Sequence, residues 1–175
     1  MQDWFSFVGE AKCAYNLDMT CLSNVYEKEQ KEYYIFSSIW SELEPEHVVA
    51  EPVVVKHLDL HTCTMEEVEG VDTVPFEFHF KNSVRVSGFA GWFTTNFCGR
   101  DSSPLSYPVM LSTSPEVGFT HWGQQVFYLE KPLDLVQGDI VKGTFKMFRQ
   151  KTNKRLYYVD ISYEVSPGTG EFPGG

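Results

Sequence analysis

The chain has 175 residues, of which 42% are hydrophobic and 15% aromatic, and it carries a formal net charge of −10. This length and composition exclude a disordered chain and indicate one domain, or one domain with an appendage. The apolar runs are too short to span a bilayer and the N-terminus has no signal-peptide pattern. We therefore expect a cytoplasmic and/or nuclear protein without a membrane partner.

The negative charge is concentrated in the first part of the chain. Residues 1–77 hold 16 acidic and 4 basic residues, a net −12, whereas residues 78–175 hold 8 acidic and 10 basic residues, a net +2. An acidic surface favours a basic protein partner. The one dense basic run, from Lys142 to Arg155, straddles an expected hairpin and is explained as its solvated tip, so we expect no nucleic-acid partner.

The first forty-odd residues predict a helical segment. Thr20 is placed to cap a helix, and Pro45 ends the region. Apolar residues recur at helical spacing between these two points: Leu22, Val25, Tyr26, Tyr33, Phe36, Ile39 and Trp40. So much apolar surface on a short helical segment indicates that the segment docks onto another body.

From Glu51 onward the pattern predicts strands, with only one short helical turn, which Thr64 and Glu67 would close as a capping box. Phe76, Phe78 and Phe80 alternate with polar residues, as in a half-buried strand. The expected strands cover residues 52–62, 76–80, 84–97, 107–112, 124–130, 139–149 and 156–165. Strands at this spacing without intervening helices indicate an antiparallel sandwich or barrel.

Neither a metal nor a cofactor site is assigned from the residues alone. His57, Asp59, His61 and Cys63 would share one face of a strand. Four such ligands would be spread over about 20 Å, too far to converge on one zinc ion. No glycine-rich turn between a strand and a helix marks a nucleotide or cofactor pocket, and no G-x-S-x-G sequence marks a nucleophilic serine.

The segment 119–128 places His121 and Trp122 side by side at the mouth of an expected strand, between Gly118 and Gly123. The two glycines allow the backbone to turn sharply. Loops held by rigid strands usually carry binding and catalytic groups. An isolated His-Trp pair more often packs on a sheet, so the pair gains significance only beside further motifs.

Five segments, in this order, resemble the C-terminal half of type I protein arginine methyltransferases, and the resemblance extends from Trp4 to about Val165. The five segments are Tyr15-Asn16-Leu17-Asp18-Met19, Glu51-Pro52-Val53, Phe89-Ala90-Gly91-Trp92-Phe93, Leu111-Ser112-Thr113-Ser114-Pro115, and Thr120-His121-Trp122 followed by Gln125-Val126-Phe127-Tyr128. The long helical segment through Trp40 resembles the plant-type members, whose arm is extended.

The resemblance implies a mainly β fold, an antiparallel β-barrel with an N-terminal helical arm. It divides the chain into a dimerisation arm (1–44) and a substrate-binding barrel (45–166), and the proline- and glycine-rich composition of residues 167–175 predicts a disordered tail. It implies that His121 orients an acidic residue of a cofactor domain, that Trp122 lines the groove for the target arginine, and that Thr120 fixes the loop. The arm residues implied to contact a second subunit are Trp4, Tyr15, Asp18, Met19, Leu22 and Tyr26.

The implied function is transfer of a methyl group from S-adenosyl-L-methionine to an arginine nitrogen of basic proteins, by an enzyme that forms dimers. The family's cofactor site and catalytic glutamates lie in an N-terminal domain that this sequence lacks. We therefore expect the chain to be a fragment or partial gene product that is inert alone. Two alternatives remain: a stand-alone, non-catalytic barrel that binds and regulates a complete methyltransferase subunit, and a β-sandwich binding module of merely similar architecture.

Overall fold

The structure is a computed structural model that describes residues 2–100 and 102–168. It is mainly β with an N-terminal helical arm, and the strand pairs whose register is described are antiparallel, which confirms the predicted fold class. The strands are β1 Ile39–Ser41, β2 Gly70–His79, β3 Val84–Gly91, β4 Thr94–Arg100, β5 Ser103–Ser112, β6 Gln124–Leu135, β7 Ile140–Arg149 and β8 Tyr157–Ser166.

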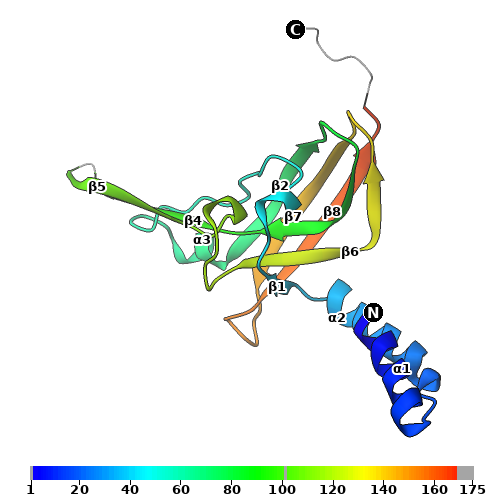
Figure 1. The fold of residues 1–175 in the computed structure, drawn as a ribbon. Helices are drawn as coiled ribbons and strands as arrows, with labels where there is room; N and C mark the ends of the chain where they lie inside the picture. The colour runs from blue at the N-terminus through cyan, green and yellow to red at the C-terminus, as the bar shows by residue number, and fades with distance from the viewer. Residues whose placement is uncertain (1, 101, 169–175) are drawn as a thin grey trace. The chain divides into compact units, whose positions relative to one another are not determined.

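The strands form three sheets, with orders β1-β6-β3, β2-β7-β8 and β4-β5 (Figure 1). The chain divides into two compact units, each built from two stretches of sequence. The first unit contains Met1–Pro45 and Ser87–Pro132, and the second contains Glu46–Val86 and Leu133–Gly175. The predicted helical arm therefore belongs to the same unit as the His-Trp segment.

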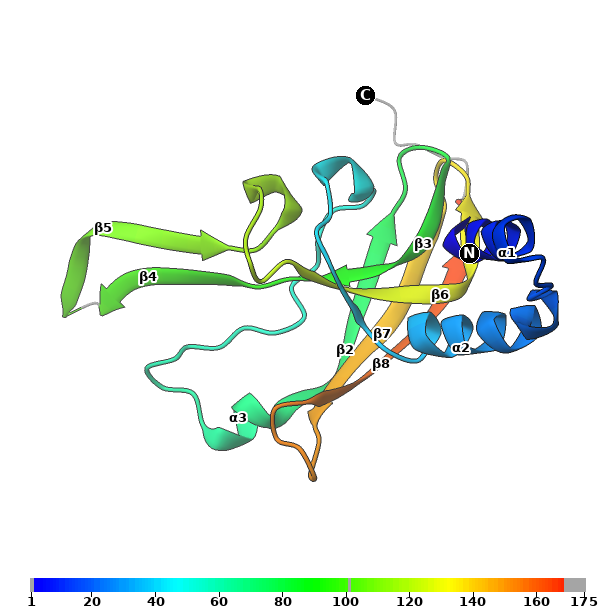
Figure 2. The same cartoon turned by 60° about the horizontal axis from the view of Figure 1, so that its bottom comes forward.

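The arm consists of two helices, α1 (Gln2–Tyr15) and α2 (Ser23–Ile35), which lie side by side (Figures 1 and 2). The indole of Trp4 stacks on the ring of Tyr26 with centroids 4.5 Å apart, and Trp4 Nε1 donates a hydrogen bond to Ser23 Oγ at 3.0 Å. A stacked aromatic pair with a satisfied indole N–H is a favourable way to join two short helices. Trp4 and Tyr26 thus hold the arm together internally.

Replacing Trp4 by alanine is expected to loosen α1 from α2. The change removes the ring stack, which contributes about 1 kcal/mol beyond the burial of the rings, and the hydrogen bond to Ser23. Hydrogen–deuterium exchange should show faster exchange of the α1 amides. Phe36→Ala is the control, because the Phe36 side chain is 81% exposed and its loss should leave α1 unchanged. Equal protection of α1 in the Trp4→Ala protein would show that the stack does not join the helices.

Two expectations for the arm are wrong in detail. The helix predicted through Trp40 ends at Ile35, and Trp40 lies in β1, where it pairs with Gln125 of β6. Thr20 does not cap α2: it begins a separate 3-10 turn, where its N–H and its hydroxyl donate to Asp18 Oδ1 at 3.0 and 2.6 Å. Long-range pairing of a strand outweighs local helical spacing.

The sheet β2-β7-β8 is organised around the predicted Phe76–Phe80 alternation. Phe76 and Phe80 are buried, and Val141 of the neighbouring strand is 2% exposed. Gly143 makes this packing possible, because a Cβ there would collide with the ring of Phe76 and with the carbonyl of Ser162. The capping box is confirmed: the Thr64 hydroxyl accepts from Glu67 N, and Glu67 Oε2 accepts from Thr64 N at 2.7 Å.

The strand predicted over residues 52–62 is wrong, because the structure assigns no strand there. Asp59 accepts hydrogen bonds from His61 N and Thr62 Oγ1, both at 2.9 Å, and so forms a turn in the middle of the segment. These hydrogen bonds, the backbone N–H of His61 first, hold the pKa of Asp59 below its usual value. A side chain that bonds its own neighbouring backbone competes with a sheet ladder.

The long strand predicted over residues 84–97 is divided in two. β3 ends at Gly91 and joins the sheet of β1 and β6, whereas β4 begins at Thr94 and pairs with β5. Trp92 and Phe93 make the link between the two sheets. Gly88 lies against the Phe127 carbonyl, where a Cβ would not fit.

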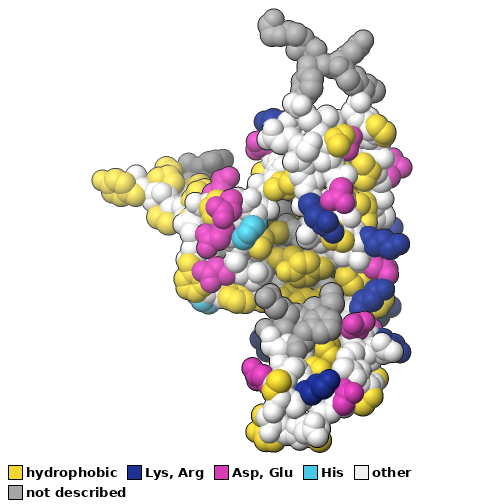
Figure 3. All heavy atoms as spheres, turned by 45° about the vertical axis from the view of Figure 1, so that its right-hand side comes forward, with side chains coloured by type: hydrophobic (Ala, Val, Ile, Leu, Met, Phe, Trp, Pro, Cys, Tyr) yellow, Lys and Arg dark blue, Asp and Glu magenta, His cyan; other side chains and the backbone are white. Residues whose placement is uncertain are grey.

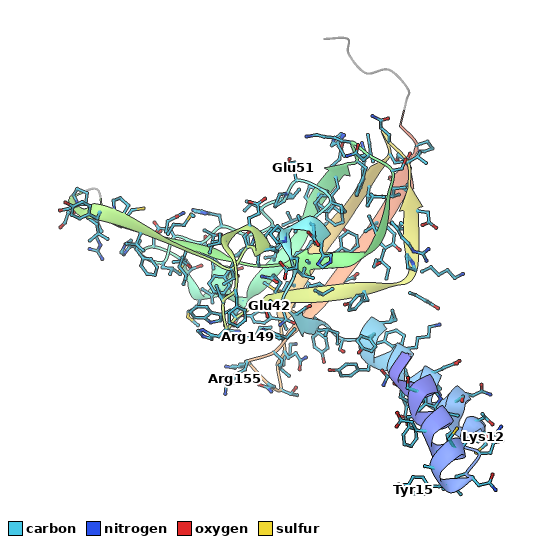
Figure 4. All side chains as sticks on the ribbon, viewed as in Figure 1. Lys12, Tyr15, Glu42, Glu51, Arg149 and Arg155 are labelled. Atoms are coloured by element: carbon cyan, nitrogen blue, oxygen red, sulfur yellow. The ribbon has the colours of Figure 1, made fainter. Side chains whose placement is uncertain are left out.

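The basic run is part of the β7–β8 hairpin, as predicted. Arg149 lies at the end of β7 and Arg155 in the connecting turn (Figure 4). Residues 169–175 of the predicted disordered tail lie outside the described residues. Within the described part of the chain, no helix is both long enough and apolar enough to cross a bilayer.

Candidate functional site

The predicted His-Trp segment is the end of the loop that joins β5 to β6. Gly118 and Gly123 both adopt positive φ angles, 96° and 54°, so the loop turns at the two glycines as predicted. The N–H of Gly123 donates to the carbonyl of Thr120 at 3.0 Å and closes a turn around the pair. His121 and Trp122 therefore occupy the two central positions of that turn.

Three aromatic rings meet at this turn. The rings of His121 and Trp122 have centroids 3.9 Å apart, and the Phe93 ring meets Trp122 edge-on with centroids 5.9 Å apart. Phe93 comes from the link between β3 and β4, and its place in the site was not predicted. The Trp122 side chain remains 45% exposed. Its indole is thus held in place and yet accessible.

The backbone of Trp122 is fixed by a second tryptophan. Trp40 Nε1 donates to the carbonyl of Trp122 at 2.8 Å. The indole of Trp40 fits there only because residue 123 is glycine: a Cβ at Gly123 would lie 2.6 Å from Trp40 Nε1 and 2.7 Å from the carbonyl of Ser41. Trp40 is therefore a positioning residue, which sequence periodicity had placed on a helix.

Gln124 joins the start of β6 to two other segments. The side chain is 4% exposed, its Nε2 donates to the carbonyl of Thr113 at 2.9 Å, and its Oε1 accepts from Leu43 N at 2.8 Å. Both halves of the amide are thus satisfied, which is the usual condition for a buried polar group. The sequence reasoning missed Gln124, and the only sequence signal was its position directly after the turn.

Thr113 anchors the other end of the loop. It is completely buried, its N–H and hydroxyl donate to the carbonyl of Phe93 at 3.0 and 3.2 Å, and its hydroxyl accepts from Phe93 N at 3.2 Å. The contacts of Thr113 therefore fix Phe93, and through Phe93 one side of the Trp122 ring. Several of the five resembling segments meet in one cluster.

Among the described residues, the turn has one buried polar atom without a hydrogen-bond partner, Thr120 Oγ1. His121 is exposed, and its ring lies beside the ring of Trp122. An unpaired buried hydroxyl costs free energy, so the turn is suited to a further polar partner. A flat indole can stack on a guanidinium, and an imidazole can hold a carboxylate.

The six residues predicted to contact a second subunit are dispersed over the arm. Trp4 and Tyr26 stack between the helices, and the carboxylate of Asp18 accepts from Thr20. Tyr15 and Leu22 are 76% and 44% exposed, and Tyr15 lies at the end of α1 (Figure 4). Met19 and Tyr15, with the C-terminal half of α1, line a hollow of about 530 Å³. Contact with a second subunit stays a prediction for all six.

The base of the arm is attached to β6 within the same unit. Lys31 Nζ and Glu130 Oε1 form an ion pair at 2.5 Å, and the rings of Tyr34 and Tyr128 meet edge-on with centroids 5.9 Å apart. The hydrogen bond from Lys31, followed by its charge, holds the pKa of Glu130 below its usual value. Among the described residues, an exposed ion pair and an aromatic contact therefore attach the arm to β6, in addition to β1.

Acidification is expected to loosen this attachment. The pKa of Glu130 is lower in the folded state than in the unfolded chain. The ion pair therefore stabilises the attachment fully at pH values above the unfolded-state pKa. This stabilisation is lost as the pH falls through the folded-state pKa. The effect should be small and should shrink with salt, since both groups are exposed. NMR signals of the Tyr128 ring should shift in an acid titration of the native protein. That shift should vanish in the Glu130→Gln variant and persist in the Glu29→Gln control. If the shift persists in both variants, the titration of Glu130 is not its cause.

The fold and the site together define a class of protein. Residues 2–168 match the family model of the arginine methyltransferase oligomerization subdomain, and the chain belongs to this family. The chain is 38% identical over 175 residues to the protein arginine N-methyltransferase PRMT10 of Oryza sativa subsp. japonica, covering 98% of this chain and 45% of the relative. It thus corresponds to the C-terminal region of such proteins and spans less than half of the relative's length.

Two solved structures share the fold. That of the Arabidopsis thaliana protein arginine methyltransferase 10, described as uniquely open, superposes with a TM-score of 0.75 at 34% identity and covers 97% of this chain and 49% of that one. The Trypanosoma brucei PRMT1 enzyme-prozyme heterotetrameric complex with AdoHcy gives a TM-score of 0.62 at 20% identity, covering 92% and 48%. The family match confirms the resemblance and excludes a module of merely similar architecture.

Proposed function

We propose that this chain is the part of an arginine N-methyltransferase that shapes the substrate groove and makes the subunit contacts. The observation that carries the proposal is the exposed His121–Trp122 pair, 3.9 Å apart, in a turn that Trp40 and Gln124 hold from behind. A rigid scaffold that supports an accessible aromatic surface is the arrangement that arginine recognition requires. The names of the rice and Arabidopsis relatives support this assignment.

In this proposal each residue of the turn has a separate role. Trp122 lines the groove, and its exposed indole stacks against the guanidinium of the target arginine. His121 orients a carboxylate that another domain supplies, and Thr120, whose buried hydroxyl is unpaired, keeps the turn in shape by bonding to the same domain. The exposed Tyr15 and Leu22 offer apolar surface to a second subunit, while Asp18 and Met19 shape the loop between the arm helices.

The methyl donor of the proposed enzyme is S-adenosyl-L-methionine, and the related trypanosome complex contains AdoHcy. The described residues do not fit this cofactor: the described strand registers are antiparallel, and no strand leads through a glycine-rich turn into a helix. We therefore place the donor in a domain outside these residues and expect the chain alone to transfer no methyl group. The substrate class is basic proteins, which suit the net −12 of residues 1–77.

A chimaera tests the proposal. This chain replaces the matching 45% of the rice relative, and methyl transfer to an arginine-rich peptide is measured. We expect an active enzyme whose turnover falls strongly when His121 and Trp122 are both changed to alanine. Gln125→Ala, a change at an exposed neighbour on β6, should keep turnover. A folded chimaera without activity would refute the proposal. Full activity of the double variant would show that His121 and Trp122 have only a structural role in the turn.

A second candidate function is that of a non-catalytic subunit that binds and regulates a complete methyltransferase. The enzyme–prozyme assembly of the trypanosome protein is a precedent in a structure of the same fold. The chain has a mass of 20.1 kDa. A cellular protein of this mass that alters the turnover of a complete relative on mixing would favour the second function. A markedly larger cellular protein would favour the first.

A further inference from the structure

The turn between β7 and β8, residues 150–156, concentrates positive charge. Residues 140–159 contain six of the 14 basic residues of the chain and no acidic residue. The turn projects beyond the end of its sheet (Figures 1 and 2). Backbone hydrogen bonds close it: Gln150 N donates to the carbonyl of Leu156 at 2.8 Å, and Leu156 N donates to that of Asn153 at 3.0 Å. The charges at the turn are therefore carried on a defined backbone.

Only part of this charge is balanced by neighbours. Three of the six basic residues face a neighbour on the sheet, in the pairs Lys142–Glu77, Lys146–Asp160 and Arg149–Tyr157. The other three, Lys151, Lys154 and Arg155, lie in the turn, are exposed, and form no ion pair with a described residue. On the face drawn in Figure 3, basic and acidic side chains are interspersed, as on an ordinary solvated surface. The turn instead presents three charges of one sign.

Apolar side chains lie beside these charges. Phe148 and Tyr158 are cross-strand partners, so their side chains share one face of the sheet. They are 46% and 65% exposed, and Leu156 in the turn is 50% exposed. A solvated hairpin tip accounts for the three cations but not for three exposed apolar side chains next to them. Such a combination is typical of a binding surface.

We propose that the end of this hairpin binds an acidic segment of a partner protein. The binding surface consists of Phe148, Lys151, Lys154, Arg155, Leu156 and Tyr158. The three cations receive carboxylates of the segment, and the aromatic pair receives an apolar side chain that lies between those carboxylates. The inference does not depend on the proposed methyl transfer, because the basic proteins proposed as substrates would be repelled here.

Nucleic acid and membrane fit this surface less well. Phosphates continue along a nucleic-acid strand, whereas the unbalanced cations end with the turn. The helix α3 (Met65–Glu69) carries three glutamates directly before Gly70, which pairs with Phe148. A strand stacked on Phe148 would therefore meet carboxylates. Attraction to an anionic membrane usually takes about four or more clustered basic residues, and the turn has three.

Fluorescence anisotropy with the complete chain tests the proposal. The probe is a fluorescein-labelled peptide of glutamates with interspersed phenylalanines, and the reference peptide has glutamine in place of every glutamate. We expect saturable binding of the acidic peptide, weaker at higher salt, and no binding of the reference peptide. Circular dichroism checks that each variant below is folded.

Two triple variants with the same net charge locate the binding. Lys151→Gln/Lys154→Gln/Arg155→Gln should bind the acidic peptide about tenfold more weakly, because three exposed ion pairs are lost. The control, Lys12→Gln/Lys28→Gln/Lys131→Gln, removes three exposed positive charges elsewhere and should bind like the natural chain. A general electrostatic attraction would weaken equally in both.

A tyrosine variant tests the apolar part of the surface. Tyr158→Ser keeps every charge and should weaken binding several-fold. Tyr107→Ser, at an 86% exposed tyrosine on β5, is the control and should leave binding unchanged. If the hairpin triple variant does not fold, Arg155→Gln takes its place beside Tyr158→Ser.

Several results would overturn the proposal. Equal binding by the two triple variants, or no saturable binding at all, would leave the turn as a solvated tip. Tighter binding of an oligouridylate or of phosphatidylserine vesicles than of the acidic peptide would assign the surface to a nucleic acid or a membrane. Self-association that only the hairpin variant abolishes would assign it to a second copy of the chain.

Discussion

Gly123→Ala is expected to lower the free energy of unfolding by about 3 kcal/mol and to displace the turn that carries His121 and Trp122. Two causes add: the φ of 54° disfavours a residue with a Cβ, and that Cβ would lie 2.6 Å from Trp40 Nε1. Relief of the contact requires the Trp40 indole to move, which breaks its hydrogen bond to Trp122. Urea unfolding followed by tryptophan fluorescence measures the loss.

A second substitution at the same position separates the two causes. Asparagine adopts the left-handed conformation more readily than alanine, but it also has a Cβ. If crowding against Trp40 dominates, Gly123→Asn is as destabilising as Gly123→Ala. If the backbone angle dominates, Gly123→Asn is much less destabilising than Gly123→Ala. The close approach of Trp40 is then not the main reason for glycine at position 123. Gly9→Ala, in the open interior of α1, is the control and should stabilise by about 1 kcal/mol.

The parts of the fold that sequence reasoning predicted depend on neighbours in the sequence. The alternation from Phe76 to Phe80 and the capping box of Thr64 and Glu67 are complete within a few residues, so their chemistry is visible in the sequence. Segment 52–62 shows the limit of this reasoning. Its valines and leucines favour a strand, but the hydrogen bonds of Asp59 form a turn within it.

The parts of the site that were missed depend on distant neighbours. Trp40 continues the helical spacing of the arm, and only its pairing with Gln125, 85 residues away, makes it a strand residue behind the turn. Gln124 has no distinguishing pattern, because its role is set by the backbone of Leu43 and Thr113. The accessible His121 and Trp122 could be found from flanking glycines and resemblance, whereas the groups that support them could not.

Gln124→Leu is expected to cost about 3 kcal/mol, because leucine fills a similar volume but leaves two backbone groups unpaired. The carbonyl of Thr113 and the N–H of Leu43 both lose their partner in a site where Gln124 is 4% exposed. The turn loses its support from β6 at the same time. In the chimaera we therefore also expect a lower kcat/KM for the peptide. Gln125→Leu is the control, since Gln125 is exposed and its role in β1 pairing is a backbone one.

Gln124→Glu is expected to have a pH-dependent effect on stability, which a general packing defect would not produce. A carboxylate can still accept from Leu43 N, but it opposes the carbonyl of Thr113, and only the protonated acid can donate to that carbonyl. Burial and this repulsion should raise the pKa of the new side chain above its unfolded value. The protonated side chain at position 124 then contributes fully to stability below the pKa of the unfolded state. This contribution is lost as the pH rises through the raised pKa of the folded state. The gap in unfolding free energy between the variant and the natural chain should therefore narrow on acidification. If this difference in unfolding free energy does not change with pH, the hydrogen bond from Gln124 Nε2 to the carbonyl of Thr113 does not contribute to stability.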